Sequence, residues 1–174
     1  MPILSYNGIW PKIAPDVFIA EGAMIIGDVT IGEGSSVWYN AVIRGDTAPV
    51  TIGRRTNIQD NCTLHVDEDA PCVIGDDCSI GHGAIVHGAT LSDRVLVAMN
   101  AVVLSRASVG SDSIVGACAL VSEGKQLPGG MVYRGVPAKP SRPLSDAERA
   151  DLPARAGRYR GYAANHKASK EQQA

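Results

Sequence analysis

The chain has 174 residues, of which 45% are apolar and only 5% aromatic, and its formal net charge is −2. That length suffices for one domain with a full core, and the near-neutral charge favours neither a nucleic-acid partner nor a membrane surface. No stretch approaches the roughly 18 apolar residues of a membrane helix, no leader-like segment opens the sequence, and the four cysteines form no Cys-x-x-Cys pair. We therefore expect a cytoplasmic protein without a signal peptide, a disulfide framework or a cysteine zinc site.

Residues 19–127 repeat every six residues. An aliphatic residue marks each of eighteen hexads, and every one is Ile, Val or Leu: Ile19, Ile25, Ile31, Val37, Ile43, Ile52, Ile58, Leu64, Ile74, Ile80, Val86, Leu91, Val97, Val103, Val109, Val115, Val121 and Leu127. Fifteen of these hexads place a second, mostly small residue four positions later, such as Ala41, Thr47, Cys62, Cys78 or Thr90. This period fits neither an amphipathic helix nor a sandwich of alternating hairpins.

A six-residue period predicts an all-β solenoid of very short parallel strands. Each hexad supplies one strand and one corner, three hexads make a triangular coil, and the aliphatic residue fills the interior. The eighteen hexads of the repeat then make six coils. We interpret Cys62 and Cys78, which occupy the small inward position, as core residues without a redox role.

The repeat is interrupted three times. Three extra residues lie between Ile43 and Ile52, four lie between Leu64 and Ile74, and one is missing between Val86 and Leu91. These interruptions surround three of the chain's four histidines. Interruptions of a solenoid map to loops, and loops commonly carry sites.

Two of these histidines are predicted to stack. His65 follows Leu64 and His87 follows Val86, so both side chains point outward. Three hexads separate the two positions, which is one coil, or about 4.8 Å in the stacking direction. Two rings so placed can converge on one ion with Zn–N bonds of about 2.0–2.1 Å. Arg44 belongs to the same column.

The third histidine lies elsewhere on the prism. His82 comes two residues after Ile80, at a corner on the preceding face. It could reach an ion held by His65 and His87 only from another subunit, which predicts a closed oligomer, most simply a trimer. The alternative is that all three histidines are surface residues hydrogen-bonded to loop carboxylates.

After Leu127 the repeat ends. Residues 134–140 predict an extended exit segment, and Ser145-Asp-Ala-Glu148 is a capping box that starts a helix near residue 146. We expect the helix to run to about Lys167, with Pro153 breaking or restarting it.

The domain boundaries follow from this pattern. Residues 1–133 are expected to form a lead-in and about six coils, and residues 134–174 the exit segment and the helix. The second part carries nine Lys/Arg and four Asp/Glu, so we expect it to dock on the acidic coils rather than on nucleic acid. His166 is interpreted as a solvated helix residue.

Several motifs resemble one family. Arg44-Gly-Asp46, Thr56-Asn-Ile-Gln-Asp60, His65, Ile80-Gly-His82 and Val86-His-Gly88 resemble the γ-class carbonic anhydrases, over nearly the whole chain. The resemblance implies a left-handed parallel β-helix of hexapeptide repeats with a C-terminal α-helix. It also implies a homotrimer with zinc, or sometimes iron or cobalt, bound between subunits.

The family's site residues carry over by motif position. The resemblance implies that His65, His82 and His87 are the metal ligands. Gln59 would hydrogen-bond and orient the hydroxide that forms on the metal, with Asn57 nearby in the pocket.

The remaining motif positions are polar. Arg44 and Asp60 would form an ion pair across the interface, and Asp46 would help to order that edge. Tyr159, in the C-terminal helix, is the position that would match a tyrosine reaching toward the site.

The implied reaction is the reversible hydration of carbon dioxide to bicarbonate. Efficient members of the family resemble one another in a long acidic loop with a proton-shuttle glutamate. Here the insertion is only Val66–Pro71, and Thr47 stands where an acidic neighbour is expected. Asp67, Glu68 and Asp69 could substitute or could form a solvated turn, so we expect modest turnover.

Three alternatives remain open on the sequence. One is a hexapeptide acyltransferase, which uses a histidine as general base between subunits. Another is a thioesterase acting on acyl-CoA, and the third is a catalytically weak metal-binding protein.

Overall fold

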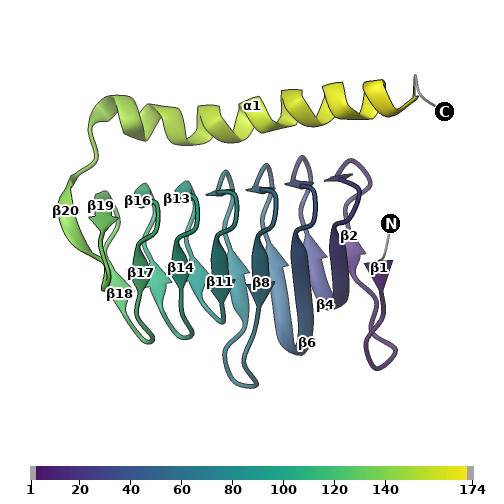
Figure 1. Ribbon diagram of the computed structural model, residues 1–174, viewed down its shortest axis with the longest axis horizontal. Coiled ribbons are helices and arrows are strands. Elements are labelled where there is room, and N and C mark those ends of the chain that lie inside the picture. The colour runs from purple at the N-terminus through teal and green to yellow at the C-terminus, as the bar shows by residue number, and fades with distance from the viewer. Residues whose placement is uncertain (1–2, 172–174) are drawn as a thin grey trace.

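The computed structural model of the protein describes residues 3–171, with side chains described up to residue 169. The chain winds into a left-handed parallel β-helix of about seven turns, and one long helix lies along its side (Figure 1). The solenoid of short parallel strands predicted from the repeat is confirmed, and β1 and β2 of the lead-in add a turn to the six predicted coils. No helix among the described residues combines the length and the apolar character that a membrane span requires.

Three stacks of strands form the faces of the prism. The first stack contains β1 (Ile3–Leu4), β4 (Met24–Ile31), β6 (Val42–Ile52), β8 (Thr63–His65), β11 (Ile85–His87), β14 (Val102–Val103) and β17 (Leu120–Val121). The second contains β2 (Lys12–Ile13), the later parts of β4 and β6, β9 (Cys72–Ile74), β12 (Thr90–Leu91), β15 (Ser108–Val109) and β18 (Gln126–Leu127).

The third stack is a separate sheet. It contains β3 (Phe18–Ile19), β5 (Ser36–Val37), β7 (Asn57–Ile58), β10 (Ser79–Ile80), β13 (Val95–Val97), β16 (Ser113–Val115), β19 (Met131–Arg134) and β20 (Lys139–Pro143). Pairing is parallel throughout these stacks except between β19 and β20, where the exit segment turns back antiparallel. Residues 3–18 supply the predicted lead-in: Ile3 pairs with Ile25, and Lys12 pairs with Thr30.

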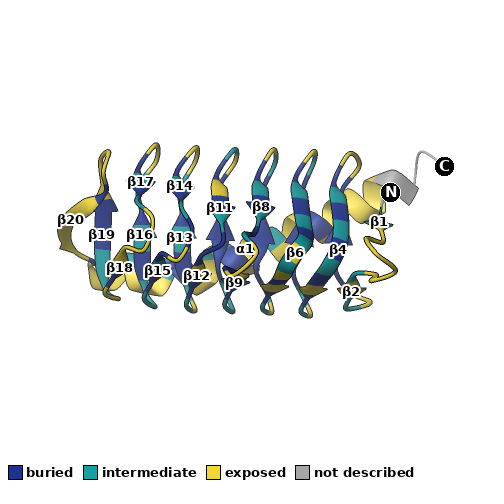
Figure 2. Cartoon of the chain, turned by 90° about the horizontal axis from the view of Figure 1, so that it is seen from below, coloured by how far each residue is buried: buried dark blue, intermediate teal, exposed yellow. Residues whose placement is uncertain are grey.

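The aliphatic residue of each hexad fills the prism. From Ile25 to Leu127, every one of these side chains is at most 4% exposed, and Ile19 at the open end is partly buried. Burial concentrates along the strands while the turns are exposed (Figure 2). Cys62 and Cys78 lie in this core as predicted, and burial raises the pKa of both thiols to about 12.

Two residues assigned to the small inward position point outward instead. Thr47 and Thr90 are exposed, and Val50 and Ala89 are buried in their neighbourhood. Both departures follow an interruption of the repeat, because adding or removing residues shifts which side chain faces the interior.

The C-terminal helix α1 spans Asp146–Glu171 and begins at the predicted capping box. The Ser145 backbone N–H donates to Oε2 of Glu148 at 3.0 Å, and the Glu148 N–H donates to Oγ of Ser145 at 3.3 Å. The expected break at Pro153 is wrong, because the helix continues through it. Pro153 is exposed, while Leu152 and Ala156 on either side are buried against the prism. Water can satisfy the carbonyl that proline leaves unpaired, and packing keeps the helix continuous.

Helix α1 covers the third stack, where it contacts β3, β5 and β10. Phe18, Trp38 and Ala163 form one apolar contact between helix and prism, and Val132, Leu144 and Leu152 form another. Arg149 reaches Asp112 of the coils at 3.5 Å. The basic segment therefore docks on the body of the chain.

Candidate metal centre

The first half of the candidate site is the paired-histidine face, which we define as Arg44, Asp46, His65 and His87. Strands β8 and β11 pair in parallel with His65 directly opposite His87, as the coil spacing predicts. Nδ1 of His65 lies 3.0 Å from Nε2 of His87, and the two ring centroids are 5.0 Å apart. Stacking of consecutive coils thus points two imidazole nitrogens at one place.

The outer nitrogen of His65 contacts a carboxylate. Nε2 of His65 donates to Oδ1 of Asp46 at 2.9 Å, and Arg44 forms an ion pair with the other oxygen of Asp46. Burial raises the pKa of Asp46, but the hydrogen bond from His65 and the charge of Arg44 outweigh it and hold that pKa below its ordinary value. Asp46 is therefore an anion that can only accept.

The outer nitrogen of His87 contacts a hydroxyl. Nδ1 of His87 lies 2.9 Å from Oγ of Ser105, and Ser105 donates to Oδ2 of Asp67 at 2.5 Å. Asp67 belongs to the inserted loop, whose ends are joined by a backbone bridge between Asp67 and Ala70. The hydrogen bond from Ser105 holds the pKa of Asp67 below its ordinary value, so this carboxyl is also an anion.

These contacts assign the ring protons. His65 carries its proton on Nε2, since Asp46 can only accept. His87 carries its proton on Nδ1, since the Ser105 hydroxyl proton goes to Asp67. The facing nitrogens are then both bare lone pairs, 3.0 Å apart. Lone pairs repel unless a cation lies between them, and metal-bound imidazoles usually donate their other N–H to such partners. The donor set fits a divalent metal.

The second half is the His82 corner, defined as Asn57, Gln59, Asp60, His82 and Tyr159. The His82 side chain is 49% exposed, and its Nδ1 lies 2.7 Å from Oδ2 of Asp60. Since Asp60 can accept the Nδ1 proton, Nε2 is left free and accessible. All three predicted ligands thus have a polar partner on the nitrogen that would not bind metal.

The amide of Gln59 is held in one orientation. Its Oε1 accepts from the His82 backbone N–H at 3.2 Å, and its Nε2 donates to Oδ1 of Asn57 at 2.9 Å. The side-chain amide of Asn57 donates both of its N–H groups, one to the carbonyl of Cys78 and one to the hydroxyl of Ser79. Asn57 therefore orients Gln59, which keeps one N–H for a ligand.

Tyr159 also lies on this side of the prism. It packs edge-on against Trp38, with ring centroids 5.4 Å apart, and lines a hollow of about 280 Å³ together with Asp60, His82 and Tyr162. Burial and the charge of Asp60 raise the pKa of Tyr159. His166 is exposed, as expected, but its Nδ1 also lies 2.8 Å from the Tyr39 hydroxyl.

The structure does not bring the two halves together within one chain. Among the described residues, no three His, Cys, Asp or Glu side chains converge as a metal site. Arg44 contacts Asp46, and Asp60 contacts His82. A site containing all three histidines, and an ion pair between Arg44 and Asp60, remain predictions about an assembly of several chains.

Reasoning from the sequence missed Ser105. The shortened hexad makes this coil 17 residues long, since Val86 pairs with Val103, so Ser105 lies one position past the residue that stacks on His87. Counting coils alone therefore does not point to Ser105.

Known proteins resemble this chain both in its repeat and over most of its length. The family model "Bacterial transferase hexapeptide (six repeats)" matches residues 11–45. A Methanocaldococcus jannaschii protein named "Probable carbonic anhydrase" is 49% identical over 147 residues, which cover 84% of this chain and 92% of that protein.

Two further relatives extend the comparison. "Gamma carbonic anhydrase 2, mitochondrial" of Arabidopsis thaliana is 42% identical over 79% of this chain, but the match spans only 52% of that relative's length. The crystal structure of a "hexapeptide transferase family protein" from Anaplasma phagocytophilum superposes with a TM-score of 0.91 and 36% identity, covering 94% of this chain and 97% of that one.

Proposed function

Because the chain belongs to the γ-class carbonic anhydrase family, we propose that it catalyses the reversible hydration of carbon dioxide to bicarbonate at a divalent metal. The metal would be bound between subunits of a homotrimer, by His65 and His87 of one chain and His82 of its neighbour. The observation that carries the proposal is that Nδ1 of His65 and Nε2 of His87 face each other 3.0 Å apart, while Asp46 and Ser105 hold the outer nitrogens.

The ligand set determines what a metal would do here. Three neutral imidazoles leave a bound divalent ion its full charge, which supplies the Lewis acidity that makes water a nucleophile near neutral pH. We propose zinc, with iron or cobalt as alternatives. Cys62, Cys72 and Cys78 are buried and Cys118 is exposed; we propose a cytoplasmic location, as expected from the sequence.

The His82 corner would supply the polar groups around the reacting atoms. The remaining N–H of Gln59 can hydrogen-bond an oxygen beside the metal, and Asn57 keeps that N–H aimed. Tyr159 would border the same space, since it shares a hollow with His82. These groups bind and orient, and none of them needs to change its protonation state.

Each cycle of hydration also releases a proton that must leave the site. Asp67 and Asp69 of the short acidic loop are held by Ser105 and Arg106. Fixed carboxylates paired in this way are poor carriers, which leaves the exposed Glu68 and bulk buffer to remove the proton, so turnover would be modest.

The test is metal analysis followed by stopped-flow carbon dioxide hydration on zinc- and iron-loaded protein, with His87→Ala as the paired variant. We expect about one metal per chain, hydration that rises with buffer concentration, and loss of both metal and hydration in the variant. Full metal content in His87→Ala would remove the basis of the site.

A second assay separates the remaining classes. Acyl transfer or thioester hydrolysis with acetyl-CoA, without hydration, would overturn the proposal in favour of an acyltransferase or a thioesterase. Tight metal binding without either activity would indicate a catalytically idle relative. A high hydration rate independent of buffer would contradict the modest turnover alone.

A further inference from the structure

We propose that Ser105 and Asp67 are positioning residues that fix the tautomer and the ring angle of His87. The link to metal binding rests on the proposed function, because it takes His87 to be a ligand. The chain of contacts runs from Nδ1 of His87 to Oγ of Ser105 at 2.9 Å, and from there to Oδ2 of Asp67 at 2.5 Å. His87 itself approaches Asp67 only to 3.8 Å.

Ser105 and Asp67 together determine which ring nitrogen of His87 carries the proton. A hydroxyl can both donate and accept, so a lone serine would allow His87 either tautomer. Asp67 removes that freedom, because its carboxylate can only accept and takes the Ser105 proton. The hydroxyl oxygen must then accept from His87, which places the ring proton on Nδ1 and leaves Nε2 as the free donor atom.

Ser105, at the centre of this chain of contacts, is buried, whereas the Asp67 side chain is 44% exposed. Ser105 is 6% exposed and lies on the coil that follows His87 in the stack. Gly88 packs closely against it, since a Cβ at that position would lie 3.1 Å from Oγ of Ser105. The shortened turn after His87 is thus where the serine and the histidine ring can meet.

The inserted loop is tied to the following coils. Asp67 accepts from Ser105, Asp69 accepts from Nη2 of Arg106 at 2.6 Å, and Asp67 and Ala70 are joined through their backbones. Ser105 and Arg106 are consecutive residues, so both anchors of the loop hold the same corner. The acidic loop therefore holds the His87 ring in position through Ser105.

The experiment compares two side chains of nearly equal size at one position. Ser105→Thr keeps the hydroxyl, whereas Ser105→Val replaces it with a methyl group and fills the space that Asp67 would need to reach His87. The readouts are the ¹⁵N chemical shifts of the His87 ring in metal-free protein and the zinc dissociation constant from chelator competition.

We expect His87 to be protonated on Nδ1 in the wild type and in Ser105→Thr, and largely on Nε2 in Ser105→Val. Zinc should bind about 10–100-fold more weakly to the valine variant, the usual effect of losing a ligand's hydrogen-bond partner. If the coil rejects both larger side chains, Ser105→Ala with Asp67→Ala removes both acceptors without adding volume, and the same shift is expected.

Two outcomes separate the hypotheses. A folded Ser105→Val protein with the wild-type tautomer and zinc affinity would overturn the positioning role. A wild-type protein that binds no zinc, while its His87 tautomer still responds to the substitution, would overturn the proposed function and leave the positioning of His87 intact.

Discussion

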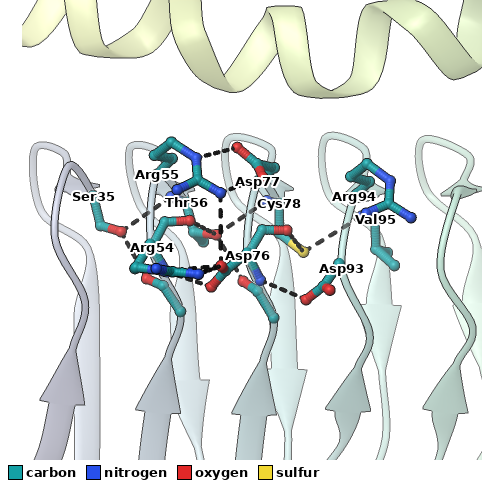
Figure 3. A network of polar contacts seen from close by, with 12 residues as sticks. Ser35, Arg54, Arg55, Thr56, Asp76, Asp77, Cys78, Asp93, Arg94 and Val95 are labelled. Atoms are coloured by element: carbon teal, nitrogen blue, oxygen red, sulfur yellow. Dashed lines mark hydrogen bonds and ion pairs between the residues drawn. The ribbon is translucent and has the colours of Figure 1, made fainter.

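Two corners of the same prism use their polar side chains in opposite ways. At one corner, shown in Figure 3, arginines and aspartates from consecutive coils form a ladder. Arg55 donates twice to Asp77 at 2.7 Å, and Arg94 donates to Asp112 at 2.8 and 3.0 Å. At the paired-histidine face, the same stacking points two imidazole nitrogens at each other, 3.0 Å apart.

The difference shows how a regular scaffold can separate structure from function. In the arginine–aspartate ladder, Arg54, Arg55 and Arg94 each meet an aspartate one coil away, so these pairs are complete within one chain. On the paired-histidine face, Asp46 and Ser105 contact the outer nitrogens, and the inner nitrogens have only each other. An incomplete donor set on an outward face predicts that something from outside the chain completes it.

The largest effect is expected when one of the proposed ligand histidines is removed, and it tests whether a second chain completes the site. His65→Ala and His82→Ala proteins should each lose metal and hydration, because each lacks one ligand of every site. After unfolding and refolding together in equal amounts, roughly a quarter of the sites of a randomly mixed trimer should be intact. Metal content and activity of the mixture are the measurements.

The control for this experiment is a mixture of His65→Ala with His87→Ala. Both variants damage the paired-histidine face, so no combination of their chains restores a site. Recovery in the first mixture and none in the second identifies a shared site. A first mixture that stays inactive, although mass spectrometry shows exchanged subunits, rules it out.

Much of this contrast could be predicted from the sequence. The coil register follows from counting hexads, because each aliphatic residue must face the interior. Leu64 and Val86 stay one coil apart despite four inserted residues, which loop out at the corner without shifting the strand. That is why the stacking of His65 and His87 could be predicted.

The hydrogen-bond partners could not be predicted in the same way. Ser105 and Asp60 depend on which rotamer each side chain adopts at a corner, and the six-residue period constrains only the strand positions. Counting four positions from the aliphatic residue misplaces Thr47 and Thr90, because each lies in a hexad whose length is not six residues. Helix α1 passes Pro153 because buried neighbours hold it, which a local rule for proline does not include.

A smaller effect is expected where the ladder is shortened. Asp112→Asn should lower the free energy of unfolding by about 0.5–1 kcal/mol, since the arginine partner is 37% exposed and solvent screens the pair. The hydrogen bond from Arg94 holds the pKa of Asp112 below its ordinary 3.8. This contribution is therefore present above pH 3.8 and is lost as the pH falls through the lowered value.

Urea unfolding at pH 7 and at successively lower pH measures this effect. The gap between wild type and Asp112→Asn should narrow as the solution is acidified. Glu33→Gln removes an exposed carboxylate at the same corner, several coils away, and should change stability by less at every pH. An equal loss in both variants would mean that net charge, and not the ladder, sets the effect.

The smallest effect is expected for the ion pair between Arg142 and Glu148 at the start of helix α1, which also forms within one chain. Arg142 donates to both oxygens of Glu148 at 2.7 Å, and with Ser145 it lowers the pKa of Glu148 to about 2. Because the folded pKa is depressed, the stabilisation of the helix start is complete above the ordinary 4.5 and disappears as the pH falls through about 2. The carboxyl ¹³C resonance of Glu148 should titrate accordingly in the wild type and move back toward 4.5 in Arg142→Gln, while metal content stays unchanged. If the Glu148 carboxyl of the wild type instead titrates at its ordinary pKa, water has replaced Arg142 at this exposed site. Ion pairs within the chain would then form only where coils stack on one another.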